Sequence, residues 1–533
     1  MKLLKSLTAF VAAAALAGGT AVSVSGAAEP SAPSAPSAPS APSAAPSAPS
    51  APSAPSGPSA HEQELELPDL GSPATAAVTL DEEYQVGRQW AYEMRSKGLV
   101  LEDPEVTDYI QQLGHSLSSR AEEGQHQFNY AVVRDNVINA FAMPGGFIMI
   151  NSGLFLATQN ENELAGVLAH ETAHVTQRHL VRGMIDQSHS GMIATAAMLA
   201  AILLGATAGR GDPQAMEGAI LGAQSAAIQH QINYTRSQEF EADRIGIGTM
   251  AAAGYDPLGM ATMFDELNKN SPAPDRTKAV EFLIDHPLSA ERVAEARNRA
   301  EQIGRIRHED SLSYLLMRER LRSLVGNPEA AREYYANLVK NGSGLDIEQR
   351  YGRAVAEINA RKPASAIPEL QSLVSEYPRV TQFYGALGQA YLANGQTKES
   401  AAILEKGLDL FPRNVPVTIR LSETLMHAGD NARAQLILDD LFNQVEPTPN
   451  QAKLIAKAAG AAGNIADSYY YMADYYLMSG DLLDASNQLS LALGLPNLNP
   501  IQRARISALL EEVRAAMPKN RKNTVADDNS GRH

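Results

Sequence analysis

The 533-residue chain has no cysteine and a single tryptophan, and its acidic residues outnumber its basic ones. Without cysteine it forms no disulfide, iron–sulfur cluster or thiolate zinc site, and it has no cysteine that could carry a lipid. The excess of 60 Asp and Glu over 44 Lys and Arg gives a net charge of −16. Such a charge disfavours binding of nucleic acid through a broad basic face. Any metal site must therefore be built from histidine, aspartate and glutamate.

The composition is otherwise that of a folded protein with several domains. Hydrophobic residues make up 44% and charged residues 20% of the chain, which excludes general disorder. The sequence predicts a signal peptide at 1–28, a Ser-Ala-Pro low-complexity linker at 29–61 and a mixed helix–strand domain at 62–304. A helical repeat domain at 305–517 and a polar tail at 518–533 follow.

The N-terminal 61 residues are typical of an exported protein with a spacer. Lys2 and Lys5 precede an apolar run at 7–17, and small residues follow at 25–28, as in a cleavable signal peptide. An uncleaved N-terminal anchor is the alternative. The regular prolines of the linker deny it backbone donors and predict a semi-rigid extended spacer.

The domain at 62–304 is predicted to combine helices with a small β-sheet. Alternating, β-rich sequence at 128–134 and 147–150 predicts strands. Asn160 can cap a helix that continues to about residue 181. The predicted fold class of the whole chain is therefore mostly α, of the α+β type.

The domain at 305–517 is predicted to be an all-α, tetratricopeptide-like solenoid. Gly395 and Gly429 are 34 residues apart, which is the length of one such repeat. A degenerate unit precedes them, with Arg361 in place of the turn glycine. The 51 residues from Gly429 to Gly480 predict an irregular helix that interrupts the array.

The strongest functional signal is His170-Glu171-Thr172-Ala173-His174. On a helix, His170 and His174 lie one turn apart on the same face, where both imidazoles can reach one zinc ion. Glu171 can then take a proton from a water beside the metal. A chance match on a surface helix is the alternative. It is the weaker one, because the surrounding residues are apolar and unpartnered histidines there are costly.

A third metal ligand is expected in the acidic stretch 237–244. Glu239 and Asp243 are four residues apart and share a helix face, so Glu239 can bind zinc while Asp243 accepts a hydrogen bond from a ligand histidine. Glu241 as the ligand would lose this arrangement. A solvated acidic face, paired with neighbouring arginines, is the structural alternative.

These motifs, together with His286-Pro287-x-x-x-x-Arg292 and the segment 139–150, resemble those of the M48 zinc metallopeptidases. The resemblance implies a zinc-dependent metalloendopeptidase with a helical, gluzincin-type domain at 62–304 and one Zn²⁺ per chain. It implies that zinc is bound by His170, His174 and Glu239, and that the catalytic residues are Glu171, His286 and Arg292. Asp243 would accept a hydrogen bond from a ligand histidine. Substrate would be bound by Asn139, Gly146, Phe147 and Ile148.

The resemblance leaves two roles open. His286 is expected beside the metal, where it either donates to the developing oxyanion or binds the zinc and keeps the enzyme latent. A histidine that merely precedes a proline at a helix boundary is the bland alternative. The strand at 147–150 is expected to offer an edge to an extended substrate peptide. By its apolar sequence alone it would be a core strand.

A charge-free segment lies between the two zinc motifs. Residues 190–209 are long enough to span a bilayer. Their many small residues favour instead a helical hairpin or lid over the active site that is buried or contacts a membrane surface.

The resemblance, with the signal peptide and the solenoid, implies a periplasmic protease of outer-membrane protein assembly, peripheral to the membrane. Its substrates would be misfolded or stalled outer-membrane proteins, and its repeats would recruit proteins of the assembly machinery. No nucleic-acid partner is expected. The alternative is a chaperone or scaffold whose proteolysis is secondary or latent.

Overall fold

The computed structural model describes residues 78–121, 126–186, 235–270, 282–342 and 344–517, which belong to one unit of the chain, Ala77–His533. The predicted signal peptide, the Ser-Ala-Pro linker, the polar tail and the charge-free segment at 190–209 lie outside these residues.

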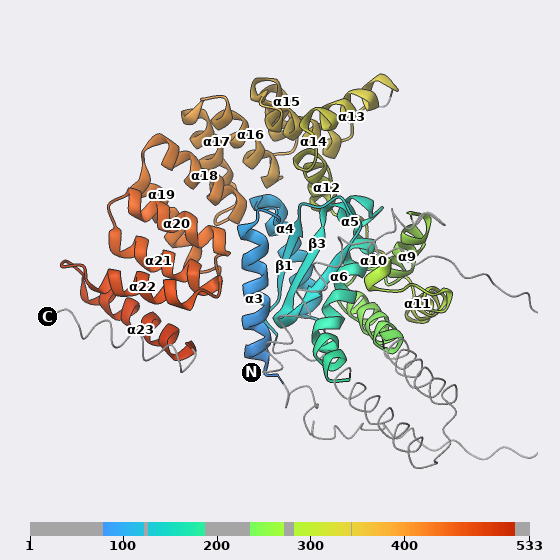
Figure 1. The fold of residues 1–533 in the computed structure, drawn as a ribbon. Helices are drawn as coiled ribbons and strands as arrows, with labels where there is room; N and C mark the ends of the chain where they lie inside the picture. Colours follow the sequence, from blue (N-terminus) through green and yellow to red (C-terminus); the bar gives the residue numbers. More distant parts are fainter. Residues whose placement is uncertain (1–77, 122–125, 187–234, 271–281, 343, 518–533) are drawn as a thin grey trace, which may run out of the picture. The chain divides into compact units, whose positions relative to one another are not determined.

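The first part of this unit mixes helices with a small sheet, and the second is entirely helical (Figure 1). The first part contains α3 (Leu80–Ser96), α4 (Pro104–Ser118), β1 (Asn129–Val133), β2 (Ala140–Met143), the 3₁₀ turn η2 (Pro144–Gly146), β3 (Phe147–Asn151), α5 (Ser152–Ala157), α6 (Glu161–Thr176), α9 (Leu258–Asn270), α10 (Phe282–Asp285) and α11 (Ala290–Ile303). Residues 179–186 and 235–252 are also helical.

The second part is a series of helical hairpins. It contains α12 (Leu312–Leu324), α13 (Pro328–Lys340), α14 (Ile347–Asn359), α15 (Pro363–Glu376), α16 (Thr381–Ala393), α17 (Thr397–Leu410), α18 (Val415–Ala428), α19 (Asn431–Phe442), α20 (Pro449–Ala461), α21 (Ile465–Met478), α22 (Leu482–Leu493) and α23 (Pro500–Ala516). The predicted fold class, mostly helical with a small sheet, is confirmed. No helix within the described ranges has both the length and the apolar character needed to cross a bilayer.

The sheet has the strand order β1-β3-β2, with β3 parallel to β1 and antiparallel to β2. The prediction that β3 offers an edge to substrate is therefore wrong: β3 is central, and all five of its residues are buried. Its continuous apolar sequence is that of a strand covered on both faces. The outer side of β1 is also covered, because Leu101 N donates to Val132 O at 2.8 Å and Arg134 N donates to Leu99 O at 2.7 Å. Among the described residues, β2 is the strand with a free edge.

The residues expected to bind substrate near β3 have structural roles in the described fold. Phe147 packs against Tyr84 of α3 with its ring tilted and the ring centroids 5.4 Å apart, and Ile148 is completely buried. Gly146 has φ +86°, and a Cβ there would lie 2.0 Å from the carbonyl oxygen of Gln127. Phe147 and Ile148 therefore fill the core and Gly146 allows a close chain crossing, and the expected role of these three residues as substrate contacts stays a prediction.

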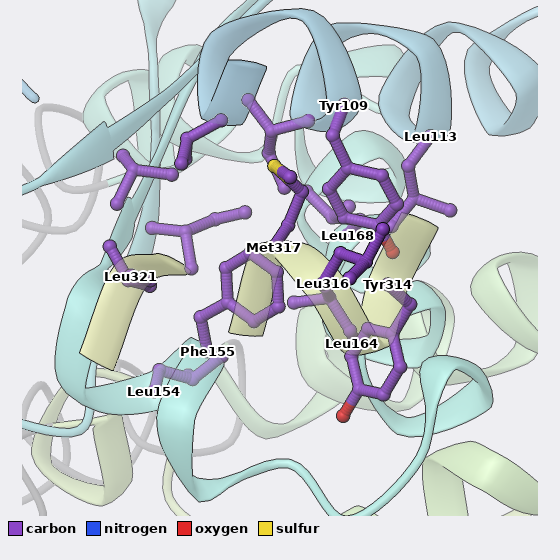
Figure 2. Close-up of a cluster of buried hydrophobic side chains, with 14 of the residues drawn as sticks. Tyr109, Leu113, Leu154, Phe155, Leu164, Leu168, Tyr314, Leu316, Met317 and Leu321 are labelled. Carbon is purple, nitrogen blue, oxygen red and sulfur yellow. The ribbon is translucent and has the colours of Figure 1, made fainter. Parts of the chain in front are cut away.

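One hydrophobic core joins the mixed helix–strand part to the first solenoid helix (Figure 2). Tyr314 and Met317 of α12 lie in the same cluster as Phe155 of α5 and Leu164 of α6. The hydroxyl groups of Tyr314 and Thr158 are 2.9 Å apart. The predicted boundary at 304–305 falls in the loop before α12, but this helix is packed into the preceding domain.

The solenoid repeats more regularly than the sequence spacing suggested. Arg361, Gly395, Gly429 and Gly463 follow one another at intervals of 34 residues, and each has a positive φ between 59° and 86°. Gly463 closes the hairpin of α20 and α21, so the predicted interruption of the array is wrong. The 51-residue interval ends at Gly480 because this glycine lies in the next turn, between α21 and α22.

Arg361 marks a position where a substitution is expected to stabilise the fold. It is exposed and takes the left-handed conformation that glycine takes in the next three repeats. Relief of about 1–2 kcal/mol of backbone strain exceeds the roughly 0.5–1 kcal/mol entropic cost of glycine. Arg361→Gly is therefore expected to raise the urea midpoint of unfolding. Arg361→Ala, which keeps the Cβ, should not, and equal midpoints for the two variants would contradict this account.

Candidate metal centre

The motif helix α6 begins where Asn160 accepts a hydrogen bond from Glu163 N at 3.0 Å, and it is buried on almost every face. It presents His170 and His174 side by side, with their Nε2 atoms 3.0 Å apart. The helix was predicted to continue to about residue 181, but it ends at Thr176. Arg178, with φ +51°, then breaks the chain direction before residues 179–186 form a new helix.

Two further side chains converge on the same point. Glu239, from the helix at 235–252, places its carboxylate oxygens 3.5 Å from His170 Nε2 and 3.5 Å from His174 Nε2. Nδ1 of His286, which follows α10, lies 3.2 Å from both oxygens of Glu239 and 3.3 Å from His170 Nε2. One donor atom from each of the four residues lies within 4.8 Å of every other.

This donor set fits a zinc ion. Tetrahedral ligands at about 2.0–2.1 Å from zinc are about 3.3 Å apart, close to the separations of 3.0 to 3.5 Å here. Nitrogen lone pairs and a carboxylate that converge in a buried place need a cation between them. The chemistry and spacing of His170, His174, Glu239 and His286 therefore suit a metal ion.

Glu171 lies beside this point and is 1% exposed. Neither of its carboxylate oxygens makes a hydrogen bond of normal geometry with another described residue, and Oε1 lies 3.4 Å from His286 Nε2. Burial raises the pKa of Glu171, although the neighbouring His286 and His170 act in the opposite direction. A buried carboxylate beside this donor set, with no side-chain hydrogen bond of normal geometry to the described residues, is suited to hold and move the proton of a water molecule.

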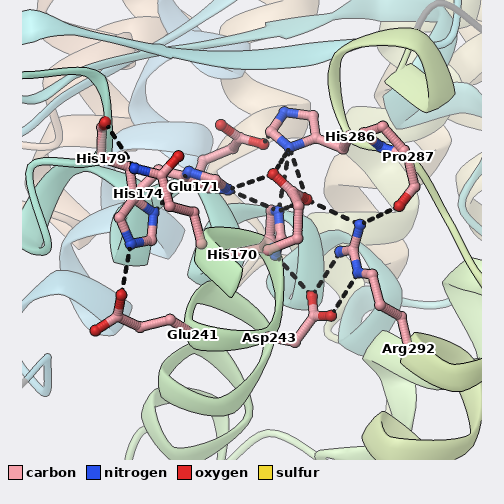
Figure 3. A network of polar contacts seen from close by, with 11 residues as sticks. His170, Glu171, His174, His179, Glu241, Asp243, His286, Pro287 and Arg292 are labelled. Carbon is pink, nitrogen blue, oxygen red and sulfur yellow. Dashed lines mark hydrogen bonds and ion pairs between the residues drawn. The ribbon is translucent and has the colours of Figure 1, made fainter. Parts of the chain in front are cut away.

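Asp243 and Arg292 support one side of the site (Figure 3). Asp243 Oδ1 lies 3.0 Å from His170 Nδ1. The guanidinium of Arg292 donates to both oxygens of Asp243, at 2.7 and 2.8 Å, and its Nη1 lies 2.8 Å from Glu239 Oε2. Arg292 is 2% exposed. It therefore holds the two carboxylates in place, and its charge is already committed to them.

The surroundings favour the metal-binding states of Glu239 and His174, whereas they favour the protonated state of His170. Burial raises the pKa of Glu239, but His286 and His170 together hold it well below its usual value. Burial and the neighbouring His170 lower the pKa of His174 well below the ordinary range. For His170 burial also acts downward, but Asp243 and Glu239 raise its pKa to about 9. A metal ion at this site therefore competes with a proton at His170.

Sequence reasoning missed His179 and set Glu241 aside. His179 Nδ1 lies 3.0 Å from His174 Nδ1, and its Nε2 lies 3.1 Å from Glu241 Oε2. Arg182 Nη1 donates to the same oxygen of Glu241 at 3.0 Å. Burial lowers the pKa of His179 to about 4, against the opposing effect of Glu241. The signal was a third histidine five residues after the motif, which on an unbroken helix would face away from it.

The structure thus brings together His170, His174, Glu239 and His286, with Glu171 beside them. It places Asp243 against His170 and buries Arg292 behind Asp243 and Glu239. Asn139, at the base of β2, is 5% exposed and belongs to the sheet rather than to this cluster.

Comparison with known proteins adds a family match for each part of the chain. Residues 104–300 match Peptidase family M48, and residues 351–415 and 391–458 match tetratricopeptide repeats. The beta-barrel assembly-enhancing protease of Escherichia coli (strain K12) is 31% identical over 451 residues, covering 84% of this chain and 91% of that protein. The protease of the same name from Yersinia pestis is 32% identical over 460 residues, covering 86% and 93%. Metalloprotease LoiP of Escherichia coli is 32% identical over 171 residues, covering 32% of this chain and 62% of that protein.

Proposed function

Because the chain belongs to peptidase family M48 and carries C-terminal tetratricopeptide repeats, we propose that it is a periplasmic zinc endopeptidase of outer-membrane protein quality control. The observation that carries the proposal is the convergence of His170, His174 and Glu239 beside the buried carboxylate of Glu171. Similarity to beta-barrel assembly-enhancing proteases along most of both chains supports the link to assembly.

In this proposal His170, His174 and Glu239 hold one zinc ion per chain. When bound, zinc supplies Lewis-acid polarisation of the scissile carbonyl. Glu171 takes the proton of the attacking water and later delivers it to the leaving amine. Asp243 keeps His170 in the tautomer whose Nε2 faces the metal, and Arg292 holds Asp243 and Glu239 in position.

The free edge of β2 is the favoured place for substrate. An extended peptide can add to this edge by main-chain hydrogen bonds, which read the backbone more than the side chains. Such recognition suits misfolded or stalled outer-membrane proteins. The solenoid would recruit proteins of the assembly machinery. A chaperone or scaffold function of the same surfaces, with secondary or latent proteolysis, is the second candidate.

His286 favours a latent resting state. Its Nδ1 stands 3.2 Å from Glu239 and 3.3 Å from His170 Nε2, where a fourth ligand belongs. If nine sites in ten are closed in this way, His286→Ala should raise peptide cleavage by about tenfold, because the open fraction limits the apparent activity. Initial rates on an unfolded protein substrate measure this effect. A fall in rate at unchanged metal content would instead assign His286 to the oxyanion.

Removal of the metal tests the proposal directly. Treatment of the full chain with a zinc chelator, followed by dialysis, is expected to abolish cleavage of an unfolded protein substrate, and added Zn²⁺ should restore it. Mg²⁺ is the control and should not restore activity, because it prefers oxygen ligands in octahedral geometry. Elemental analysis should find one zinc per chain. A gently purified chain that holds no metal, or a metal-free chain that cleaves at the original rate, would contradict the proposal.

A further inference from the structure

The two motif histidines are supported in different ways by the same helix. His170 Nδ1 meets the carboxylate of Asp243 directly, and Arg292 holds that carboxylate. His174 Nδ1 meets a carboxylate only through a second imidazole, that of His179. Both carboxylates, Asp243 and Glu241, come from the helix at 235–252, and each is bound to an arginine. The two arrangements are therefore parallel, with one extra ring on the side of His174.

With Nε2 of His174 on the metal, these contacts have one consistent set of hydrogen-bond directions. When Nε2 of His174 faces the metal, its other nitrogen, Nδ1, carries the hydrogen. Nδ1 of His179, 3.0 Å away, must then accept that hydrogen bond. Nε2 of His179 carries its own hydrogen and donates to Glu241 Oε2 at 3.1 Å. Glu241 accepts a further hydrogen bond from Arg182.

We infer that His179 is the positioning residue of His174: it holds the imidazole of His174 in the tautomer and orientation that present Nε2 to the metal. His179 is itself held by a series of hydrogen bonds to Glu241 and then Arg182. The inference rests on the proposed role of His174 as a metal ligand. It adds three residues, His179, Glu241 and Arg182, which are not among the four donor residues of the cluster.

The local fold is built to bring His179 to this place. Residues five apart on a continuous helix are turned about 140° from each other, so His179 would face away from His174. The left-handed residue Arg178 ends α6 and reverses this. Its side chain is anchored, because Nε donates to Glu83 Oε1 at 2.7 Å and Nη2 to Val78 O at 2.5 Å. These contacts hold Arg178 in its strained left-handed conformation, and this conformation brings His179 next to His174.

The Glu241–Arg182 pair is partly exposed to solvent, whereas the corresponding Asp243–Arg292 pair is buried. Glu241 and Arg182 line a hollow of about 590 Å³ together with Ser237, Phe240, Arg244, Glu291, Glu295 and Arg299. The side chains of Arg292 and Asp243 are 2% and 3% exposed, against 36% and 27% for Arg182 and Glu241. Water screens the outer pair more, so loss of the Glu241 charge should weaken metal binding less than loss of the imidazole of His179.

Zinc affinity of the full-length chain, measured by competition with a chromophoric chelator, tests the inference. His179→Ala removes the acceptor and is expected to raise the dissociation constant about 10–100-fold, the usual effect of losing a group that orients a metal ligand. His179→Asn keeps an oxygen near the position of Nδ1 and should recover most of that loss. Glu241→Gln keeps the acceptor for His179 and should lose less than His179→Ala. The absorption bands of the Co²⁺-loaded chain should shift in His179→Ala and return towards the original spectrum in His179→Asn.

The control is Glu295→Gln, which lines the same hollow and pairs with Arg299 rather than with His179. It should bind zinc like the unchanged chain. Equal affinity of His179→Ala and the unchanged chain would overturn the inference, as would an Asn variant that binds as weakly as the Ala variant at the same unfolding temperature. If His179→Ala does not fold, the ranking of His179→Asn and Glu241→Gln against the control decides. An unchanged chain that neither binds zinc nor cleaves protein would overturn the proposed function itself, and the role of His179 with it.

Discussion

Glu171→Gln is expected to lower peptide cleavage by about 10²–10⁴-fold, the usual contribution of a general base, while the chain keeps its metal and its fold. Glutamine has nearly the same shape as glutamate but cannot take the proton of the attacking water. The carboxylate is 1% exposed, and its loss weakens the contact of Oε1 with His286 Nε2 at 3.4 Å, while the remaining amide oxygen can still accept from the backbone of Ala142. Initial rates on an unfolded protein, with zinc content and unfolding temperature measured on the same sample, check the prediction.

A matched control lies on the same helix. Glu163 accepts a hydrogen bond from Gln159 N at 2.7 Å at the start of α6, away from the donor cluster. Glu163→Gln should leave the cleavage rate unchanged and lower stability only slightly. If Glu171→Gln retained a tenth of the rate or more, another group would be the base. In cells, full complementation by Glu171→Gln would favour the chaperone or scaffold candidate over proteolysis.

Arg320→Met is expected to destabilise the chain by about 3–5 kcal/mol, because it leaves two buried carboxylates with only one of their two arginines. Arg320 of α12 is fully buried and donates to both oxygens of Asp103, each at 2.7 Å, and it lies 3.0 Å from Glu105 Oε2. Arg420 of α18 contacts the same two acids, at 3.1 and 2.8 Å. This cluster joins the start of α4 to two solenoid helices, so its loss should also expose the chain around α12 to limited proteolysis.

An exposed pair serves as the control. Arg413 lies 3.2 Å from Asp440, and both side chains are more than half exposed. Arg413→Met should cost about 0–1 kcal/mol, the usual range for surface ion pairs. The double variant Arg320→Met/Asp103→Asn should regain part of the lost stability, since it removes the charge left unpaired. A double variant no more stable than Arg320→Met would show that lost packing, not charge, is the cause.

The same cluster predicts how the effect depends on pH. Burial alone would raise the pKa of Asp103, but Arg320 and Arg420 hold it well below its usual value. A carboxyl with a lowered folded-state pKa stabilises the fold above its unfolded value of about 3.9, and this contribution is lost as the pH falls through the folded pKa. The stability gap between the unchanged chain and Arg320→Met should therefore be full at neutral pH and shrink below about pH 4. Urea unfolding at both pH values measures it, and a constant gap would contradict the assignment.

Spacing along single helices was enough to find the centre of the site. The four-residue interval predicted that His170 and His174 share a face, and the same interval selected Glu239 together with Asp243. These predictions depend on the pitch of the α-helix, which is a local property. The contact of Asp243 with His170 then needed only that the two helices pack side by side.

Three features could not be predicted in this way, because they depend on a helix break, on neighbouring strands and on a helix from a distant part of the chain. His179 reaches His174 through the turn at Arg178, which a helical pattern does not anticipate. β3 became the central strand because β1 and Leu99–Leu101 cover one side and β2 covers the other. Arg320 and Arg420 look like surface arginines of repeat helices until α4 supplies their carboxylates.

The amino-acid sequence by itself determined the helical class, the repeat period, the family and the residues proposed as metal ligands, since these follow from periodicity and short motifs. Tertiary structure alone decided which of the described strands has a free edge, which imidazole lies against Nδ1 of His174, and how the solenoid is fastened to the peptidase core. Those outcomes depend on contacts between separate elements, from His174 and His179, five positions apart, to Asp103 and Arg420, 317 positions apart. Their partners are selected by packing and by the cost of leaving a buried charge unpaired.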